Sequence, residues 1–293
     1  HLKGVEWDAY VNDDNLFSKL KGVPASATAI SNADQLLAGE LMAPIGSQEV
    51  WACGVTYFKS KVGRQEESKD AGGGDFYGRV YEARRPEVFF KATPHRVVGH
   101  GGLVNIRKDS TWDVPEPELT LVVTSSGKIV GYTIGNDMSS RSIEGENPLY
   151  LLQAKTYDAC AGIGPCVFVT DQPLAPSTAI TLTIVRDGKH VFEGNTAFDQ
   201  MKRSPTELVS FVYHSASFPT GALVMTGTGI VPGSDFTLKS GDVIHIDIDS
   251  IGRLTNTVRR CRSLALARRQ ARSRYGKPPC RALLRQQGLP RRL

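Results

Sequence analysis

Short runs of alternating apolar and polar residues dominate the chain between residues 49 and 258. In one of them, Ile244, Ile246 and Ile248 alternate with polar residues, which is typical of a strand that buries one face. Similar runs predict strands over 50–57, 88–91, 103–107, 119–124, 129–134, 180–185, 189–192, 222–226 and 243–248. Asp187-Gly188 predicts a tight hairpin turn between two of these strands. The pattern therefore predicts a mostly-β (α+β) fold with few helices.

Helical signals are sparse. Ser204, Pro205 and Glu207 form the start of a helix that we expect to continue to about residue 216. Ser31 is positioned to cap a second, short helix over residues 31–37. The polar stretch 59–78 has no clear period and contains three consecutive glycines, so we expect a mobile loop or lid there.

Length and composition are typical of a globular, turn-rich chain. A length of 293 residues predicts about two domains. No run of 18 apolar residues predicts a membrane span, and the first residues lack the apolar core of a signal peptide. The five cysteines are sparse and form no CxxC pair, so we expect unpaired thiols in a cytoplasmic protein.

The net charge of +5 is unevenly placed. Residues 259–293 contain eleven Arg, one Lys and no acid, which leaves 23 basic and 30 acidic side chains, a net of −7, in residues 1–258. This acidic part would repel phosphate, so we expect no nucleic-acid binding except through the basic tail. The composition of the tail predicts a disordered extension, a localisation element or out-of-frame translation.

Three carboxylates are predicted to meet on one hairpin. Glu116 and Glu118 lie two residues apart in a strand and therefore share a face, about 6–7 Å apart. If Ser126-Gly127 is a two-residue turn, paired residue numbers add up to 253, and Asp137 lies opposite Glu116. Such a cluster needs protons or a cation to balance it.

Carboxylate oxygens suit a hard cation, with Mg²⁺ as the first choice and Mn²⁺ or Ca²⁺ as alternatives. A solvated acidic face on an edge hairpin is the competing interpretation, because Pro115 and Pro117 suit an edge strand.

An ordered set of motifs identifies a family. They are Phe89-Phe90-Lys91, Pro115-Glu116-Pro117-Glu118-Leu119, residues 135–141, Gln153-Ala154-Lys155, Gly164-Pro165, residues 225–229 and Gly241-Asp242-Val243. With these motifs residues 49–258 resemble the fumarylacetoacetate hydrolase superfamily, and most of all its branch of 2-keto-3-deoxy-D-arabinonate dehydratases. The resemblance implies a mixed β-roll catalytic domain over 49–258, a small N-terminal domain and a homodimer or larger assembly. We expect 1–48 to be a short, truncated form of that N-terminal domain.

The resemblance also implies roles for single residues. Glu116, Glu118 and Asp137 would bind magnesium. Lys155 would act as a catalytic base, because a nearby dication and a closed pocket lower the pKa of a lysine; a solvated surface lysine is the alternative.

Five further residues are candidates for substrate binding. Lys91 and Arg141 would hold the substrate carboxylate or neutralise the acidic cluster, and Arg141 alone fits equally well as the structural partner of a buried acid. Ser60, Thr228 and Gly229 would orient substrate hydroxyls, although residues 227–229 also fit an ordinary tight turn.

One departure from the family favours a lyase. Hydrolase branches carry a His and then a Glu that activate water, but Ser60 and Gly63 stand at these positions, and His95 or His100 would have to approach through the fold. We therefore predict magnesium-dependent dehydration of a 2-keto-3-deoxy sugar acid, a small 2-keto acid, to a dioxo acid through a metal-stabilised enolate. An acylpyruvate-type carbon–carbon hydrolase or an isomerase on the same metal site is the alternative. Glu66 or Glu67 on the lid would assist the departing hydroxyl or remain solvated charges.

Overall fold

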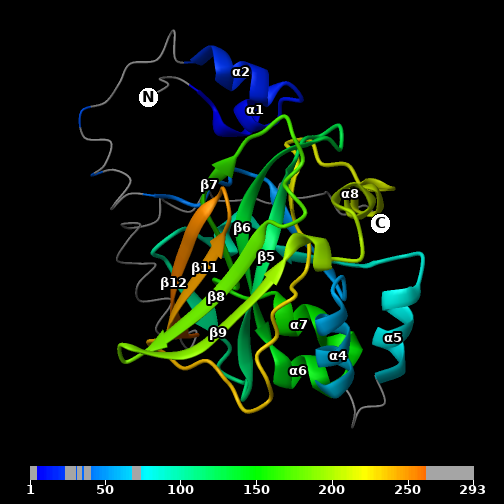
Figure 1. Cartoon of the computed structure of the whole chain (residues 1–293), viewed down its shortest axis with the longest axis vertical. Helices are drawn as coiled ribbons and strands as arrows, with labels where there is room; N and C mark the ends of the chain where they lie inside the picture. Colours follow the sequence, from blue (N-terminus) through cyan, green and yellow to red (C-terminus); the bar gives the residue numbers. More distant parts are fainter. Residues whose placement is uncertain (1–4, 24–30, 32–34, 36–40, 68–73, 262–293) are drawn as a thin grey trace, which may run out of the picture. The chain divides into compact units, whose positions relative to one another are not determined.

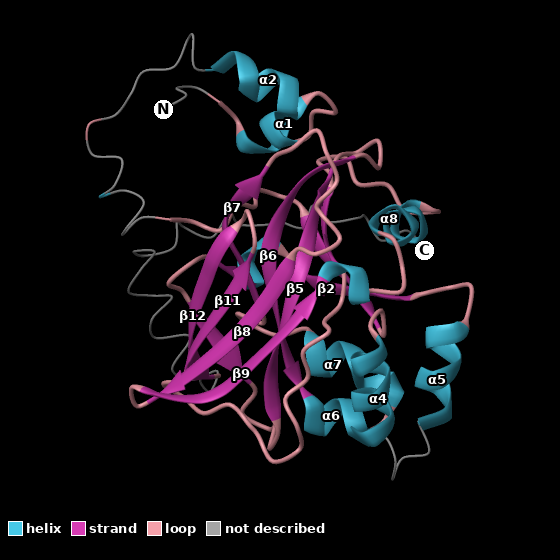
Figure 2. Cartoon of the chain, viewed as in Figure 1, coloured by secondary structure: helices cyan, strands magenta, loops and turns pink. Residues whose placement is uncertain are grey.

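Two mixed β-sheets form the body of the protein. The computed structural model describes residues 5–23, 31, 35, 41–67 and 74–261. Most of the helix expected over 31–37, and the tail beyond residue 261, lie outside the described residues. In the described part of the chain more residues lie in strands than in helices (Figures 1 and 2), which confirms the predicted fold class.

The first sheet has seven strands and the second has five. The order in the first is β2 (Glu87–Ala92), β1 (Glu49–Gly54), β10 (Ala222–Met225), β5 (Asp113–Val123), β6 (Ile129–Ser140), β7 (Ala161–Phe168) and β3 (Val97–Val98). The order in the second is β4 (Leu103–Ile106), β12 (Gly252–Arg260), β11 (Val243–Ile248), β8 (Ala179–Arg186) and β9 (Lys189–Ala197).

Helices lie around the sheets. They are α1 (Trp7–Val11), α2 (Leu16–Gly22), α4 (Phe58–Glu67), α5 (Gly74–Glu82), α6 (Arg141–Glu146), α7 (Leu151–Lys155) and α8 (Pro205–Tyr213), with short 3₁₀ turns η2 (Pro94–Arg96), η3 (Pro148–Tyr150) and η4 (Phe198–Gln200). Figure 1 shows α4, α6 and α7 gathered at one end of the β5–β6 pair. None of the described helices is long and apolar enough to cross a membrane.

All nine predicted strands are present, and three more were missed. The missed strands are β3, β7 and β12. β7 contains Gly162, Gly164 and Pro165, which interrupt an apolar run and disguise a strand buried between neighbours. The Asp187-Gly188 turn is confirmed, with both φ angles positive (+50° and +76°), as a two-residue hairpin requires.

The helix predicted after Ser204 is α8. The Ser204 hydroxyl accepts a hydrogen bond from the Glu207 backbone N–H at 3.2 Å, so the predicted cap is confirmed.

The stretch expected to be an irregular lid is helical where it is described. α4 and α5 cover most of residues 58–82. α4 buries Ser60 and Arg64, whereas its apolar Phe58 is 59% exposed. Because the buried face is polar, the usual apolar period of a surface helix is missing, and the sequence pattern was misleading.

The β5–β6 hairpin has the predicted pairing near its carboxylates but a different turn. Thr124 and Lys128 close a three-residue loop, in which Gly127 has a φ of +84°. A bulge that skips Val130 then shifts the pairing by one residue, from Val123 opposite Ile129 to Val122 opposite Gly131. The longer loop and the bulge compensate each other, so Glu116 still lies opposite Asp137.

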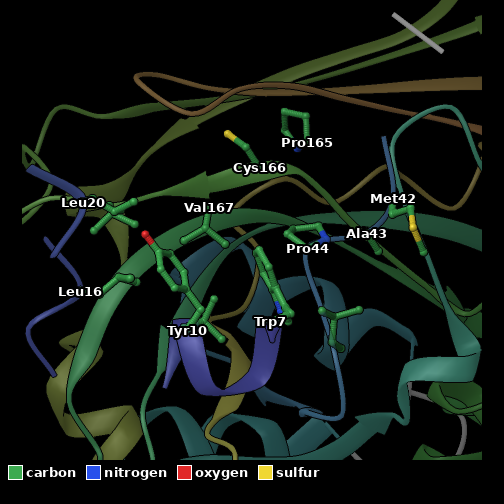
Figure 3. Close-up of a pocket in the computed structure, with 13 residues that line it drawn as sticks. Trp7, Tyr10, Leu16, Leu20, Met42, Ala43, Pro44, Pro165, Cys166 and Val167 are labelled. Carbon is green, nitrogen blue, oxygen red and sulfur yellow. The ribbon is translucent and has the colours of Figure 1, made fainter. Parts of the chain in front are cut away.

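The N-terminal helices contact the turn end of this hairpin. The Asn12 side chain accepts a hydrogen bond from the Ser125 N–H at 2.7 Å and donates to the Pro219 carbonyl at 3.0 Å. Between α1, α2, residues 42–45 and β7 lies an apolar hollow of about 540 Å³ (Figure 3). Its lining contains no charged side chain, so the chemistry predicted for the acidic hairpin lies elsewhere.

Candidate metal centre

Glu116, Glu118 and Asp137 lie together in the core of the first sheet. All three side chains are buried, and they offer ligand oxygens that lie within 4.8 Å of one another. The enclosed cavity beside them measures about 10 Å³, about the room that one water-sized particle needs. The solvated edge hairpin is therefore the wrong interpretation, because β5 lies in the middle of the sheet between β10 and β6.

Lys155 approaches the carboxylates from the end of α7. Its ammonium group donates to Glu116 Oε2 at 2.8 Å, to Asp137 Oδ2 at 3.1 Å and to Ser139 Oγ at 2.6 Å. The side chain is fully buried, which excludes the alternative of a solvated surface lysine. These contacts cross-link α7 to both strands of the hairpin.

Lys91 and Arg141 neutralise the same acids. The Lys91 ammonium pairs with Asp137 Oδ1 and donates to the Met138 carbonyl at 3.0 Å. Arg141 Nη2 lies 3.0 Å from Glu116 Oε1. Of the two roles predicted for these cations, the structure supports neutralisation of the acidic cluster.

Glu118 is held differently from its two neighbours. Its Oε2 accepts a hydrogen bond from the Gly227 N–H at 2.6 Å. Gly227 has a φ of +93°, and a Cβ there would lie 2.1 Å from Thr56 Oγ1, so only glycine allows this approach. Of this segment, Gly227 and Thr228 line the cavity and are therefore part of the centre.

The carboxyl pKa values differ because their partners differ. Burial, together with Asp137 and Glu116, raises the pKa of Glu118 well above its usual range. Burial also raises the pKa of Glu116, against the charge of Lys155. For Asp137, Lys155 and Lys91 outweigh burial and hold the pKa below its usual value.

The electrostatics of Lys155 differ from the expected pattern. Burial alone would lower its pKa, but Asp137 and Glu116 outweigh burial and raise it in the protein by itself. The predicted lowering depended on the positive charge of a bound dication. Without that charge, Lys155 is a firmly protonated partner of the carboxylates.

Glu87 is a candidate residue that the sequence analysis missed. Glu87, Phe89 and Lys91 share one face of β2, and Phe89 lines the cavity while Lys91 reaches Asp137. Glu87 Oε2 is buried without a hydrogen-bond partner and lies where a Cβ on Gly54 would be, 1.8 Å from that ideal position. Gly54 itself lines the cavity. The alternation of Glu87 with Phe89 and Lys91 was the signal that could have identified it.

The predicted substrate-binding residues are only partly brought together. Ser60 and Thr228 line the cavity, and Gly229 lies outside its lining, against Tyr57 and Thr196. Ser60 Oγ donates to the Tyr57 carbonyl at 2.7 Å, which places it in the first turn of α4. Their roles toward a substrate remain predictions.

Among the described residues, neither a histidine nor Glu66 lines the cavity. His95 Nδ1 lies 2.9 Å from Thr93 Oγ1, and His100 Nδ1 lies 3.0 Å from the Arg253 carbonyl oxygen; neither lines the cavity. Glu66 is exposed to solvent, and the Glu67 side chain lies outside the described part.

The donor set fits a hard dication. It consists only of carboxylate oxygens, the ligands that Mg²⁺ prefers. The buried ionisable groups at and around the centre are five acids and four bases. If all are counted as ionised, their net charge is −1. They are Glu87, Glu116, Glu118, Asp137 and Glu144, and Arg64, Lys91, Arg141 and Lys155. A dication and one anionic ligand add +1, so that the centre becomes neutral.

Comparisons with known proteins agree with these motifs. The family description "Fumarylacetoacetate (FAA) hydrolase C-terminal" matches residues 58–259. A probable 2-keto-3-deoxyxylonate dehydratase of Haloferax volcanii is 50% identical over 216 residues, 73% of each chain. A 2-dehydro-3-deoxy-D-arabinonate dehydratase of Saccharolobus solfataricus is 44% identical over 223 residues, 75% of each chain.

A solved structure agrees as well. A 2-keto-3-deoxy-D-arabinonate dehydratase in complex with magnesium and 2,5-dioxopentanoate superposes with a TM-score of 0.75 at 39% identity, over 87% of this chain and 90% of the other. On its motifs, its acidic hairpin and these similarities, the chain belongs to the fumarylacetoacetate hydrolase family.

Proposed function

We propose that the chain is a magnesium-dependent lyase that dehydrates a 2-keto-3-deoxy sugar acid to a dioxo acid. The observation that carries the proposal is the buried cluster of Glu116, Glu118 and Asp137. Two relatives at 50% and 44% identity are named as dehydratases of such acids. Their names support dehydration over carbon–carbon hydrolysis.

Glu116, Glu118 and Asp137 would hold the magnesium ion. When bound, the ion would supply Lewis-acid polarisation of the substrate's 2-keto group and so acidify the protons on C3. Lys91, Arg141 and Lys155 hold the carboxylates of Glu116 and Asp137 in place through the contacts described above.

Two candidates to accept a proton from C3 are Lys155, which lines the cavity, and Glu87, which lies against the cavity residue Gly54. Lys155 already donates to three acceptors, and its pKa is raised by Asp137 and Glu116 against burial, so it is a poor base in the protein by itself. Burial raises the pKa of Glu87 toward the range that suits a general base, and its Oε2 has no hydrogen-bond partner. We therefore assign the proton transfer to Glu87 and an electrostatic role to the predicted base, Lys155.

The remaining cavity residues would serve the departing hydroxyl. Removal of a proton from C3 and loss of the hydroxyl on C4 release one water and leave a double bond between C3 and C4. A proton shift from C5 to C3 then gives an enol across C4 and C5, and tautomerisation of this enol gives the C5 aldehyde of the dioxo acid. Ser60 and Thr228 carry hydroxyl groups at the cavity and would donate to or accept from the hydroxyls on C4 and C5.

Turnover of two substrate classes tests the proposal. The protein with Mg²⁺ is incubated with 2-keto-3-deoxy-D-arabinonate and, separately, with an acylpyruvate. We expect a dioxo acid from the first and no change in the second. Formation of two acids from the acylpyruvate, without dehydration of the sugar acid, would assign the site to the hydrolase alternative.

Two variants separate the candidates for the base. We expect Glu87→Gln to lower kcat at least about 100-fold while Mg²⁺ affinity is kept, because loss of a general base typically costs 10²–10⁴-fold. Lys155→Met should change Mg²⁺ affinity as well, because it removes a cation from the ligands. Normal turnover of Glu87→Gln together with an inactive Lys155→Met would return the role of base to Lys155.

We also propose a homodimer or larger assembly in the cytoplasm. Leu149 on η3 is 87% exposed and Leu152 on α7 is 54% exposed, and such neighbouring apolar side chains support an interface. Light scattering should give at least twice the monomer mass. A monomer at all concentrations would contradict the assembly.

A further inference from the structure

Arg64 is a buried cation at the cavity that the proposed reaction does not yet use. It lies four residues after Ser60 on α4, so the two side chains share a face of the helix. Both line the cavity of the carboxylates. Arg64 is only 4% exposed, whereas Glu66 on the same helix is exposed to solvent.

Arg64 is held from two sides by neighbouring helices. Its Nη1 pairs with Glu144 Oε1 on α6, and Glu144 is 1% exposed. The ring of Tyr77, on α5, lies 5.5 Å from the guanidinium carbon. Glu144 in turn lies 3.9 Å from Arg141 Nε, and Arg141 contacts Glu116. These contacts fix the guanidinium relative to the metal centre, so it can act as a precise donor.

The position of Arg64 relative to β2 indicates which part of a ligand it meets. Lys91, Phe89 and Glu87 follow one another along the inner face of β2, and Lys91 is the one that contacts Asp137. Lys91 and Glu87 lie four residues apart, so this row extends over at most about 13 Å, because β2 carries a bulge at Lys91. Arg64 lines the cavity together with Gly54, which lies opposite Glu87 in the pairing of β1 with β2, whereas Lys91 does not line the cavity. Arg64 is therefore placed on the Glu87 side of the cavity, away from Lys91.

We propose that Arg64 recognises the distal, oxygen-bearing end of the sugar acid, and so selects substrates that have oxygen beyond C3; this inference rests on the proposed function. A guanidinium has five N–H donors in a rigid fork, enough for Glu144 and a ligand oxygen together. The keto acid end is left to the carboxylate centre, where the chain's ligands for magnesium lie.

A simple structural role makes a different prediction. If the Arg64–Glu144 pair only holds α4 against α6, its loss should weaken the binding of every ligand in the cavity to the same degree. A role in recognition should weaken only ligands that carry a distal oxygen. The ratio of two affinities therefore distinguishes the roles, whatever the absolute loss.

The test uses the magnesium-loaded protein and two ligands with the same keto acid end. Pyruvate has no distal oxygen, and 2,5-dioxopentanoate has one on C5. Dissociation constants are measured by calorimetry for the wild type, Arg64→Met, Arg64→Lys and the control Glu66→Gln. Arg64→Lys keeps a cation for Glu144 and serves if the methionine variant does not fold.

We expect Arg64→Met to weaken the binding of 2,5-dioxopentanoate about 10- to 100-fold, the range for loss of a charged hydrogen bond. The affinity for pyruvate should be unchanged. Arg64→Lys should weaken only 2,5-dioxopentanoate, because its single ammonium cannot serve both partners. Glu66→Gln should change neither affinity. Equal losses for both ligands, or none, would overturn the inference. Absence of sugar-acid dehydration by the wild type would instead overturn the proposed function, and the affinity ratio would still be readable.

Discussion

The three carboxylates of the centre are not equivalent. Glu116 and Asp137 each contact cations, whereas Glu118 accepts a hydrogen bond from the backbone N–H of Gly227. A bound dication would therefore relieve Glu118 most, because like charges and burial already raise its pKa furthest.

Substitution of Glu118 tests this view. Loss of a residue that only supports a metal ligand costs about 10- to 100-fold in metal affinity. We expect Glu118→Gln to lower the affinity for Mg²⁺ by more than this, as measured by calorimetry. Glu66→Gln removes an exposed carboxyl and should have no effect. Unchanged affinity in Glu118→Gln would remove Glu118 from the ligand set.

The raised pKa values also predict a pH dependence. Glu116 and Glu118 keep their protons at pH values at which a solvated glutamate, with a pKa of about 4.3, is ionised. Protons and Mg²⁺ compete for the same oxygens, so Mg²⁺ affinity should rise with pH and fall as the pH drops toward about 5. Calorimetric titrations at several pH values check this. A pH-independent affinity would show that both carboxyls are ionised throughout.

Gly54 tests the position of Glu87 without changing its charge. A Cβ at Gly54 would lie 1.8 Å from Glu87 Oε2, so Gly54→Ala must displace that carboxylate. We expect kcat to fall at least about tenfold, since a displacement of about 1 Å can cost 10²-fold, and Mg²⁺ affinity to remain. Gly22, whose Cβ would have nothing within 4 Å, gives the control Gly22→Ala. Full activity of Gly54→Ala would argue against Glu87 as the base.

At the scale of elements, the β5–β6 hairpin shows how far register can be predicted. The side-chain period of a strand fixed which residues share a face, and the short loop limited the pairing to few registers. The loop length and the bulge at Val130 were not predictable, because each depends on the backbone twist. The predicted pairing of Glu116 with Asp137 was correct because the two deviations compensate each other.

A substitution in the turn of this hairpin should lower the stability of the protein and leave its Mg²⁺ affinity unchanged. Gly127 has a φ of +84°, and a Cβ there would meet Tyr213 at 3.6 Å, an ordinary contact. Gly127→Ala should therefore cost about 1–2 kcal/mol through the left-handed backbone alone, measured by urea unfolding. Ser125→Ala in the same turn is the matched control. Loss of Mg²⁺ affinity in Gly127→Ala would mean that the bulge does not hold the register.

α4 shows the opposite outcome. Its sequence was interpreted as a lid without period, because its buried residues are Ser60 and Arg64 and its exposed ones include Phe58. A helix that turns a polar face toward an active centre has no apolar stripe. Such a helix can be recognised only once its neighbours are known.

At the scale of the whole molecule, the acidic and the basic charges lie in different parts of the chain. β12 continues through Arg260 and pairs with β4, two residues beyond the predicted end of the catalytic segment at 258. Residues 262–293 contain nine Arg and one Lys without an acid. The basic tail and the acidic centre are thus distinct along the chain.

Removal of the tail should separate two activities. We expect deletion of residues 262–293 to leave sugar-acid turnover unchanged and to remove affinity for a polyanion such as heparin, measured by column retention, because the remaining chain is acidic. A longer deletion from residue 259 should destabilise the protein, since it removes the end of β12. Loss of turnover in the shorter deletion would assign the tail a part in the catalytic unit.

The sequence by itself determined nine of the twelve described strands, the facing of Glu116, Glu118 and Asp137, and the family, because these follow from local period and from motifs in order. The tertiary structure alone decided that Lys155, Lys91 and Arg141 neutralise the acids, that Glu87 lies over Gly54, and that Arg64 reaches Glu144. The physical reason is distance along the chain. A strand's period fixes the direction of its own side chains, but whether a side chain from another element meets them depends on packing of the whole core.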